Sequence, residues 1–131
     1  ATPYHFGVLS SAMHMAWMRQ VAGRLESRYQ YSIKIVYNDF PWPGPTSKQK
    51  AAIEDAAQAV LDARQPYLDG GATLADLYDP LAMPPALAKA HAALDRAVDR
   101  AYRPQKFTSE TNRVAFLFER YKALTATLFT T

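Results

Sequence analysis

The sequence contains no cysteine, which excludes disulfide bonds and thiolate metal ligands and is expected of a cytoplasmic protein. No apolar run approaches the roughly 20 residues that a membrane-spanning helix needs, so no membrane association is expected. The first residues contain neither a basic region nor a following apolar core, and no signal peptide is expected.

Sequence motifs of catalysis are absent as well. No glycine-rich phosphate loop, no Gly-x-Ser-x-Gly and no His-Glu-x-x-His sequence occurs, and the pair Gly70-Gly71 is typical of the end of a helix. The three histidines are scattered, and His14 lies in an apolar helical segment, which favours a hydrogen-bonded core residue over a ligand. An independent enzyme would need a catalytic constellation that this sequence does not contain.

Hydrophobic residues make up 49% of the 131 residues, enough for the core of one ordinary domain. Charge is uneven: residues 1–50 contain six basic and two acidic residues (+4), and residues 51–131 contain nine basic and ten acidic residues (−1). The first part is therefore the candidate surface for a polyanion, although four surplus charges can also serve solubility alone. Because the chain begins without Met, close to an apparent strand, it is expected to be a fragment.

The hydrophobic pattern of the first part alternates between strand and helix. It predicts a short buried strand at His5–Leu9, a helix capped by Ser10 and Ser11 that runs to about Leu25, and a second strand at Tyr31–Tyr37. The proline-rich segment 40–45 cannot continue a strand, so a domain boundary is predicted between residues 1–45 and 46–131.

The second part has helical periodicity. The pattern predicts a helix at 47–65, a turn capped by Thr73, a helix opened by Pro84-Pro85 and a last helix that begins at 107–109. The residues expected to face inward are Leu87, Leu94, Val98 and Ala101 on the third of these elements and Val114, Leu117, Phe118, Tyr121 and Leu124 on the last. The predicted fold class is mainly α (α+β), with a short β/α segment followed by a bundle of three main helices.

Acidic residues of the second part have mostly structural explanations. Asp95 and Asp99 are four residues apart and could begin a metal site, but Arg96 and Arg100 beside them favour a solvated salt-bridge face, so no metal is expected. His91 is one turn from Asp95 and is interpreted as its surface partner. Two further aspartates are interpreted as turn or capping residues: Asp76 and Asp79.

Glu26 and Arg28 form a different kind of pair. On an extended segment, residues i and i+2 point to the same side, so a donor and an acceptor would stand next to each other. Glutamate can accept from the exocyclic amine of cytosine, and arginine can donate twice to the paired guanine in the major groove. The alternative is a surface ion pair at a helix end, which contributes little energy.

Several blocks of the sequence resemble MmeI-like (type IIL) restriction–modification enzymes. Phe6–Arg19, Gly23–Leu25, Tyr31-Ser32 and Val36–Pro43 are similar to the end of their target-recognition domain. The remaining similar segments resemble their helical C-terminal domain: Leu61–Arg64, Thr73–Pro80, Met83–Pro85, Leu87, Ala90-His91, Leu94-Asp95, Ala97–Asp99, Tyr102 and Arg113–Glu119.

The resemblance implies sequence-specific binding of double-stranded DNA and N6-adenine methylation with S-adenosylmethionine, commonly with a fused nuclease. It makes Glu26 and Arg28 a base-reading pair that alternates in the family with Lys-x-Asp. The candidate phosphate contacts are Arg19, Arg24, Lys34, Lys48 and Lys50.

The family's catalytic Asn-Pro-Pro-Tyr-type motif, glycine-rich cofactor motif and nuclease motif are missing from the sequence. Met83-Pro-Pro-Ala86 lacks the amide and the aromatic ring that the first motif needs. The chain is therefore expected to have no catalytic residues and no cofactor, and to work with an upstream methyltransferase domain. The alternative hypothesis is a helical protein-interaction module without DNA contact. The unpaired edges of the predicted strands are expected to promote dimerisation.

Overall fold

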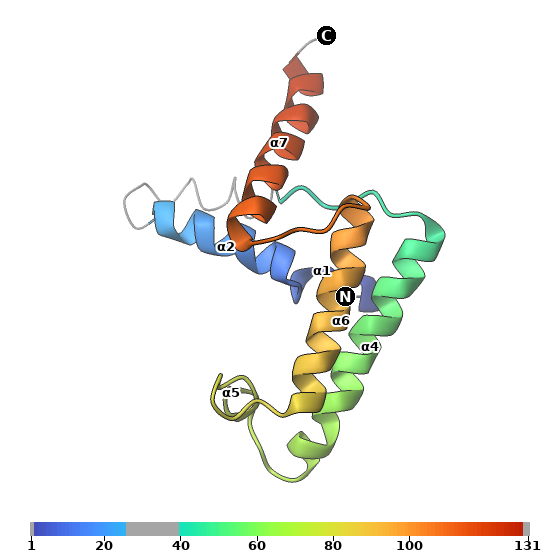
Figure 1. The fold of residues 1–131 in the computed structure, drawn as a ribbon, viewed down its shortest axis with the longest axis vertical. Helices are drawn as coiled ribbons and strands as arrows, with labels where there is room; N and C mark the ends of the chain where they lie inside the picture. Colours follow the sequence, from blue (N-terminus) through green and yellow to red (C-terminus); the bar gives the residue numbers. More distant parts are fainter. Residues whose placement is uncertain (1, 26–39, 130–131) are drawn as a thin grey trace.

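The computed structural model describes residues 2–25 and 40–129, and for residues 21–25 and 125–129 only the backbone. The described part is helical: α1 (Pro3–Leu9), α2 (Ala12–Leu25), α4 (Ser47–Asp69), α5 (Leu74–Leu77), α6 (Pro85–Tyr102) and α7 (Glu110–Phe129). Helices α4 and α6 lie side by side as an antiparallel hairpin, with α1 packed against α4 and α2 against α7 (Figure 1). None of the described helices has both the length and the apolar composition that crossing a membrane requires.

Helix starts follow the capping residues. The hydroxyl of Thr46 accepts from the backbone N–H of Gln49, and the Gln49 side chain accepts in return from the N–H of Thr46. Thr73 and Asp76 form the same reciprocal pair at α5. Gly71 follows α4 with φ of +98°, a conformation that favours glycine, so the predicted helix end at the glycine pair is confirmed.

The predicted strand at His5–Leu9 is wrong, because this segment belongs to α1. Thr2 caps the helix by accepting from the N–H of His5 at 3.2 Å, and Pro3 occupies the first turn, where its missing N–H costs nothing. The described residues contain no strand, so the fold class is mainly α but the expected N-terminal β/α segment is not observed. The predicted strand Tyr31–Tyr37 lies outside the described residues.

Gly7 allows α1 to approach the α4–α6 hairpin closely. A Cβ atom at this position would lie 2.8 Å from Ile53 Cγ2, 3.2 Å from Ala57 Cβ and 3.3 Å from Leu94 Cδ1. Carbon atoms in contact prefer separations of about 3.5–4.0 Å, so any other residue would push the helices apart.

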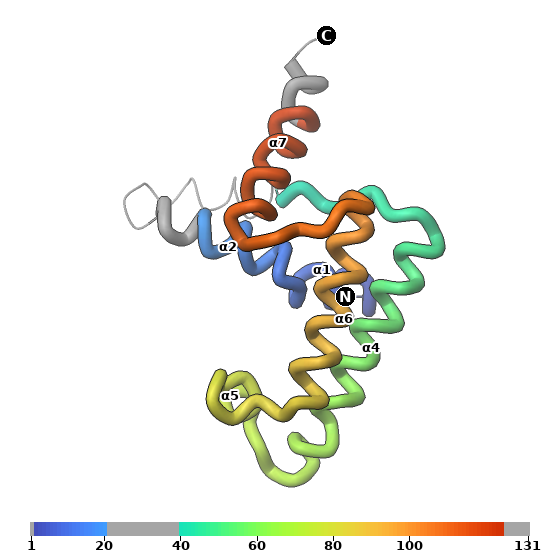
Figure 2. Tube along the Cα trace, viewed as in Figure 1, coloured from blue at the N-terminus to red at the C-terminus, as the bar shows by residue number. Residues whose placement is uncertain are grey.

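The predicted core is largely confirmed. Leu94, Val98 and Leu117 are fully buried. The exception is Leu124, which is 49% exposed. Figure 2 shows that α7 extends beyond the α4–α6 hairpin, and among the described elements it packs against α2.

Candidate nucleic-acid interface

Two stretches of the described chain flank residues 26–39, and both are fixed to the helical part. Before them, the backbone N–H of Ala12, the first residue of α2, donates to Asp95 Oδ1 on α6 at 2.8 Å. The Ser11 hydroxyl accepts from the N–H of His14 at the same helix end. The interpretation of Asp95 as part of a solvated face is therefore wrong, because this carboxylate caps a neighbouring helix.

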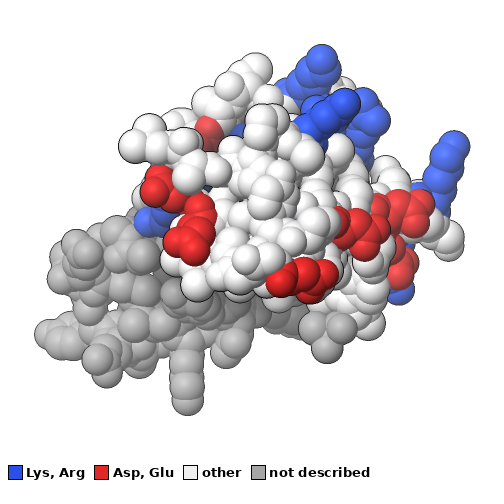
Figure 3. Space-filling view, turned by 90° about the horizontal axis from the view of Figure 1, so that it is seen from below, with Lys and Arg blue, Asp and Glu red and all other residues white. Residues whose placement is uncertain are grey.

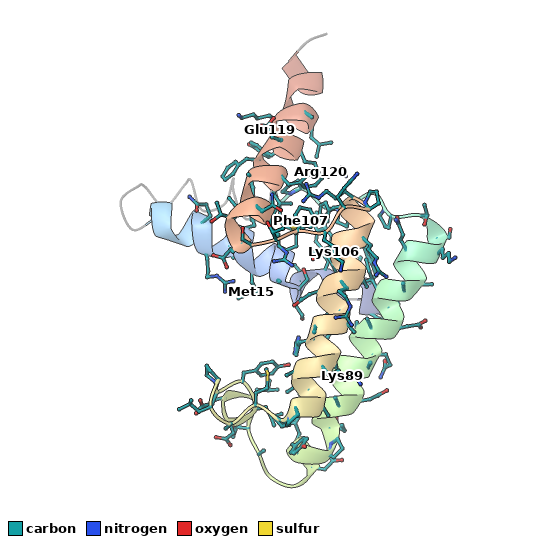
Figure 4. All side chains as sticks on the ribbon, in the orientation of Figure 1. Met15, Lys89, Lys106, Phe107, Glu119 and Arg120 are labelled. Atoms are coloured by element: carbon teal, nitrogen blue, oxygen red, sulfur yellow. The ribbon has the colours of Figure 1, made fainter. Side chains whose placement is uncertain are left out.

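The stretch that follows residues 26–39 is held by hydrogen bonds to its carbonyls. Arg120 on α7 donates from Nε and Nη2 to the carbonyl of Trp42, at 3.1 and 3.0 Å. The Tyr102 hydroxyl donates to the carbonyl of Pro41 at 2.6 Å, and burial raises the Tyr102 pKa, so the hydroxyl keeps its proton. In Figure 4, Arg120 lies where α7 passes the segment that leads into α4.

An aromatic cluster joins the two flanking stretches. Phe40 is 4% exposed, and its ring centroid lies 4.8 Å from that of His14 and 5.7 Å from that of Trp42. Trp17 stands 6.1 Å from Phe40 and 5.0 Å from Phe118 on α7. Aromatic rings at these separations stabilise the fold in addition to the burial of their apolar area. Helix α2, the segment 40–46 and α7 therefore form one packed unit.

His14 is half-buried in this cluster. Burial lowers its pKa, and the Leu9 carbonyl opposes that effect. The Nδ1 atom is buried and has no hydrogen-bond partner among the described residues. The prediction of a hydrogen-bonded core histidine is therefore confirmed in part: the ring interacts with the Leu9 carbonyl and lies against the core, but Nδ1 has no partner among the described residues.

The predicted base-reading pair, Glu26 and Arg28, lies outside the described residues, as do Lys34 and the side chain of Arg24. The remaining three candidate phosphate contacts are exposed. Arg19 on α2 forms an ion pair with Glu110, and this contact lowers the Glu110 pKa. Lys48 and Lys50 lie at the start of α4, where the Nζ atom of Lys50 is 5.6 Å from the ring centroid of Tyr4.

The structure adds a basic groove that the sequence reasoning missed. Two adjoining hollows of about 250 and 420 Å³ run along the C-terminal half of α6, between α4 and the α6–α7 connection, and share Arg96 and Arg100. The basic groove, as we call the two together, is lined by the charged residues Lys48, Arg96, Asp99, Arg100, Arg103, Lys106 and Arg113. Seen from below in Figure 3, Lys and Arg side chains gather at the upper edge of the molecule, apart from the acidic groups.

Asp99, the one acidic residue of the groove, is neutralised. Arg113 donates to its two carboxylate oxygens at 2.7 and 3.1 Å, and the side chains are only 13% and 18% exposed for Asp99 and Arg113. The carboxylate raises the Arg113 pKa, so the guanidinium stays charged. The prediction of a solvated salt-bridge face with Arg96 and Arg100 is therefore wrong, because Asp99 pairs with a residue of α7 instead.

Other acidic and histidine residues have structural roles. Asp79 Oδ1 accepts from the N–H of Leu81 at 2.9 Å, and with the capping role of Asp76 this confirms the turn-and-cap interpretation. His91 Nε2 lies 2.6 Å from the Tyr78 hydroxyl, its hydrogen-bond partner. Burial lowers the His91 pKa and the charge of Asp95 opposes that effect, so the predicted pairing with Asp95 is confirmed as an electrostatic interaction. Within residues 2–25 and 40–129, no group of three His, Asp or Glu residues could hold a metal ion.

Comparison with known proteins gives a family match for residues 1–44 and another for residues 45–129. The family described as MmeI, target recognition domain, matches residues 1–44, and the family described as MmeI, C-terminal domain, matches residues 45–129. The chain is 43% identical over 122 residues to DNA methyltransferase A of Bacillus subtilis (strain 168), which covers 93% of the chain and 14% of that relative.

A solved structure resembles the chain over nearly its whole length. It is the structure of the Type IIL restriction–modification enzyme MmeI in complex with DNA, with a TM-score of 0.83 and 54% identity over 96% of this chain. The matched region is 17% of that enzyme, so the chain spans less than a fifth of either similar protein.

Proposed function

Because the chain belongs to the MmeI family, spanning residues of its target recognition domain and its C-terminal domain, we propose that it recognises double-stranded DNA for a site-specific adenine methyltransferase. One observation supports this most directly. The stretches before and after residues 26–39 are fixed to α6 and α7 through Ala12–Asp95 and Trp42–Arg120. A base-reading segment needs such fixed ends, because contacts to base edges tolerate little displacement.

Within this proposal, Glu26 and Arg28 read one C·G base pair. The Glu26 carboxylate accepts from the cytosine N4 amine, and the Arg28 guanidinium donates to the O6 and N7 atoms of guanine. The phosphate contacts set the register of the protein on the duplex without reading sequence. We assign them to Arg19, Arg24, Lys34, Lys48 and Lys50.

We place the methyl-transfer chemistry outside this chain. S-adenosylmethionine supplies the methyl group in the proposed reaction, but residues 83–86 do not fit its site or that of the target base. Pro84 caps α6, Pro85 is its first residue, and no amide or aromatic side chain accompanies them. The chain's own contribution is recognition, through contact with DNA and with the methyltransferase domain of the same protein.

The response of binding to salt tests the proposal against its rival, a helical protein-interaction module. A protein that neutralises phosphates releases counterions, so its affinity for duplex DNA falls steeply and linearly on a log–log plot against salt. We expect the full protein to retain a labelled duplex at about 50 mM salt and to lose it progressively up to about 200 mM. Absence of retention at the lower concentration, or a binding partner that is insensitive to salt, supports the interaction module instead.

A further inference from the structure

We propose that the basic groove on α6 is a second DNA-binding surface, which contacts the phosphate backbone of the duplex through Arg96, Arg100 and Lys106. The inference rests on the proposed DNA recognition and extends it to a face that lies outside the matched target recognition domain. Of the groove's residues, only Lys48 was a candidate from sequence.

The three side chains are available to a ligand. All are exposed, and none takes part in an ion pair within the described ranges 2–25 and 40–129. Arg100 lies in the last turn of α6, where a cation interacts favourably with the helix dipole. The helix dipole therefore explains a cation at Arg100, but it does not explain Arg96, which lies one turn earlier, or Lys106, which lies beyond the helix.

The positive charge of the groove is not cancelled from within. Asp99 is committed to Arg113 in a two-bond ion pair, so the groove keeps five further cations without an acidic counterpart in its lining. Those cations are Lys48, Arg96, Arg100, Arg103 and Lys106. A concave surface with charge of one sign raises the local concentration of a polyanion.

The groove is also fixed in shape. The Arg103 guanidinium lies 3.8 Å from the ring centroid of Phe107 and donates to the carbonyls of Gln105 and Lys106, both at 3.1 Å. Its third acceptor is the side-chain oxygen of Asn112 at 3.0 Å. These bonds hold the backbone of the connection that carries Lys106, so a phosphate contact there orders only the lysine side chain.

A contact between α4 and α6 fixes the other wall of the groove. The Gln49 side chain donates to the carbonyl of Arg100 at 3.1 Å, which places the start of α4, with Lys48, beside the end of α6. The hollow that Lys48 lines together with Arg96 and Arg100 is otherwise lined mainly by small side chains, which leave it open: Ala52, Ala93 and Ala97.

The composition of the groove favours the phosphates of a duplex over other nucleic-acid groups. Binding of single strands uses exposed aromatic rings on which bases stack. The one aromatic residue of the lining, Phe107, is 9% exposed and lies beneath Arg103. The lining is rich in cations and exposes no aromatic ring, which is the composition of a phosphate-binding surface, and phosphate contacts contribute affinity without sequence preference.

The test measures duplex affinity of the full protein against salt for three single variants, Arg96→Ala, Arg100→Ala and Lys106→Ala. Each lost phosphate contact should reduce the magnitude of the log–log slope by about one, on specific and on unrelated duplexes alike. Since these exposed side chains form no ion pair with any described residue and the Gln49 bond uses the Arg100 backbone, the variants should fold like the wild type. Lys89→Ala is the matched control, because it removes an exposed cation of α6 outside the groove.

The outcomes separate this inference from the proposed function. A wild-type protein that binds duplexes with a steep slope, together with unchanged slopes in all three variants, overturns the groove and leaves DNA recognition standing. A wild-type protein that does not bind duplexes overturns the proposed function itself. In a third outcome, the slopes stay constant while the variants lose the contact between this part and the methyltransferase domain of the same protein. That result means that the groove binds protein, and it also overturns the inference.

Discussion

Asp95 on α6 caps helix α2 from a distance of 83 residues in the sequence, through the 2.8 Å hydrogen bond between its Oδ1 atom and the backbone N–H of Ala12. Burial raises the Asp95 pKa, and Asp99 adds to that effect, while the Ala12 N–H, Arg113 and His91 oppose it. The hydrogen bond and the charge therefore have opposite effects on the stability of the folded state. The acceptor oxygen holds α2 in place, whereas partial burial penalises the ionised form of the carboxyl.

Asp95→Ala and Asp95→Asn should separate these two contributions. The alanine variant loses the acceptor for Ala12, which should lower the free energy of unfolding by about 1–2 kcal/mol. The asparagine variant keeps an acceptor oxygen and removes the buried charge, so at neutral pH it should be at least as stable as the wild type. Urea unfolding of the three proteins measures the difference.

The same variants carry a pH dependence with a defined sign. The pKa of Asp95 is raised in the folded state, so the contribution of this group to stability is fully present below the ordinary aspartate pKa of about 4. As the pH rises through the folded-state pKa, the wild type loses stability relative to Asp95→Asn. An asparagine variant that is as unstable as the alanine variant, with a difference from wild type that does not vary with pH, contradicts this account of the cap.

Arg120 is expected to hold the segment that follows residues 26–39. Arg120→Met keeps an apolar stem but removes both donors to the Trp42 carbonyl, so hydrogen exchange should accelerate in residues 40–46. Lys122→Met is the control on the same helix, because Lys122 is exposed and pairs with Glu119 at 3.4 Å. Exchange that is equally fast in both variants, or unchanged in Arg120→Met, would show that the guanidinium does not restrain this segment.

Gly7→Ala should destabilise the packing of α1 although alanine favours helix by about 1 kcal/mol. The new methyl group would meet Ile53 Cγ2 at 2.8 Å, and overpacking of this kind costs about 1–3 kcal/mol. Ile53→Leu lacks the γ2 methyl and should recover part of the loss in the double variant. Gly70→Ala is the control, since its Cβ would have no neighbour closer than 3.5 Å; equal effects of the two glycine substitutions would contradict the close approach.

Glu110→Gln tests the assignment of Arg19 as a phosphate contact. In the structure Arg19 pairs with Glu110 on an exposed surface, where such pairs contribute little to stability. Removing the carboxylate frees the guanidinium and removes a repulsion from phosphate, so duplex affinity at low salt should increase by about two- to fivefold. Glu119→Gln serves as the comparison on α7, and an affinity that rises in neither variant would argue against Arg19.

The sequence predicts the four long helices α2, α4, α6 and α7 from their periodicity, and it misses what depends on distant partners. Thr73 and Pro84-Pro85 are local signals of a helix start, and the apolar stripe of α6 identifies its buried face. The strand predicted at His5–Leu9 failed because a short apolar run is ambiguous between helix and strand. Thr2 and Pro3 were the overlooked signal, since they form a helix start.

The candidate site is predictable only in part for a related reason. Asp95 and Asp99 have basic neighbours in sequence, and this pattern indicates a solvated face. Their actual partners, Ala12 and Arg113, come from other helices, so local spacing contains no information about them. The basic groove follows from this: once Asp99 turns to α7, Arg96 and Arg100 are left without the counterions that the sequence suggested.

Exchange of the proposed base-reading pair, Glu26 and Arg28, tests the central claim most directly. In the full protein, Glu26→Lys combined with Arg28→Asp should change one position of the methylated site, because Lys donates to guanine and Asp accepts from cytosine with the strands exchanged. The readout is the set of methylated adenines in a sequenced plasmid library. The control exchanges the exposed pair on α7, Glu119→Lys with Lys122→Glu, and should leave the site as it is. A changed base pair at one position of the site is the predicted result, and a methylation pattern identical to wild type contradicts the account.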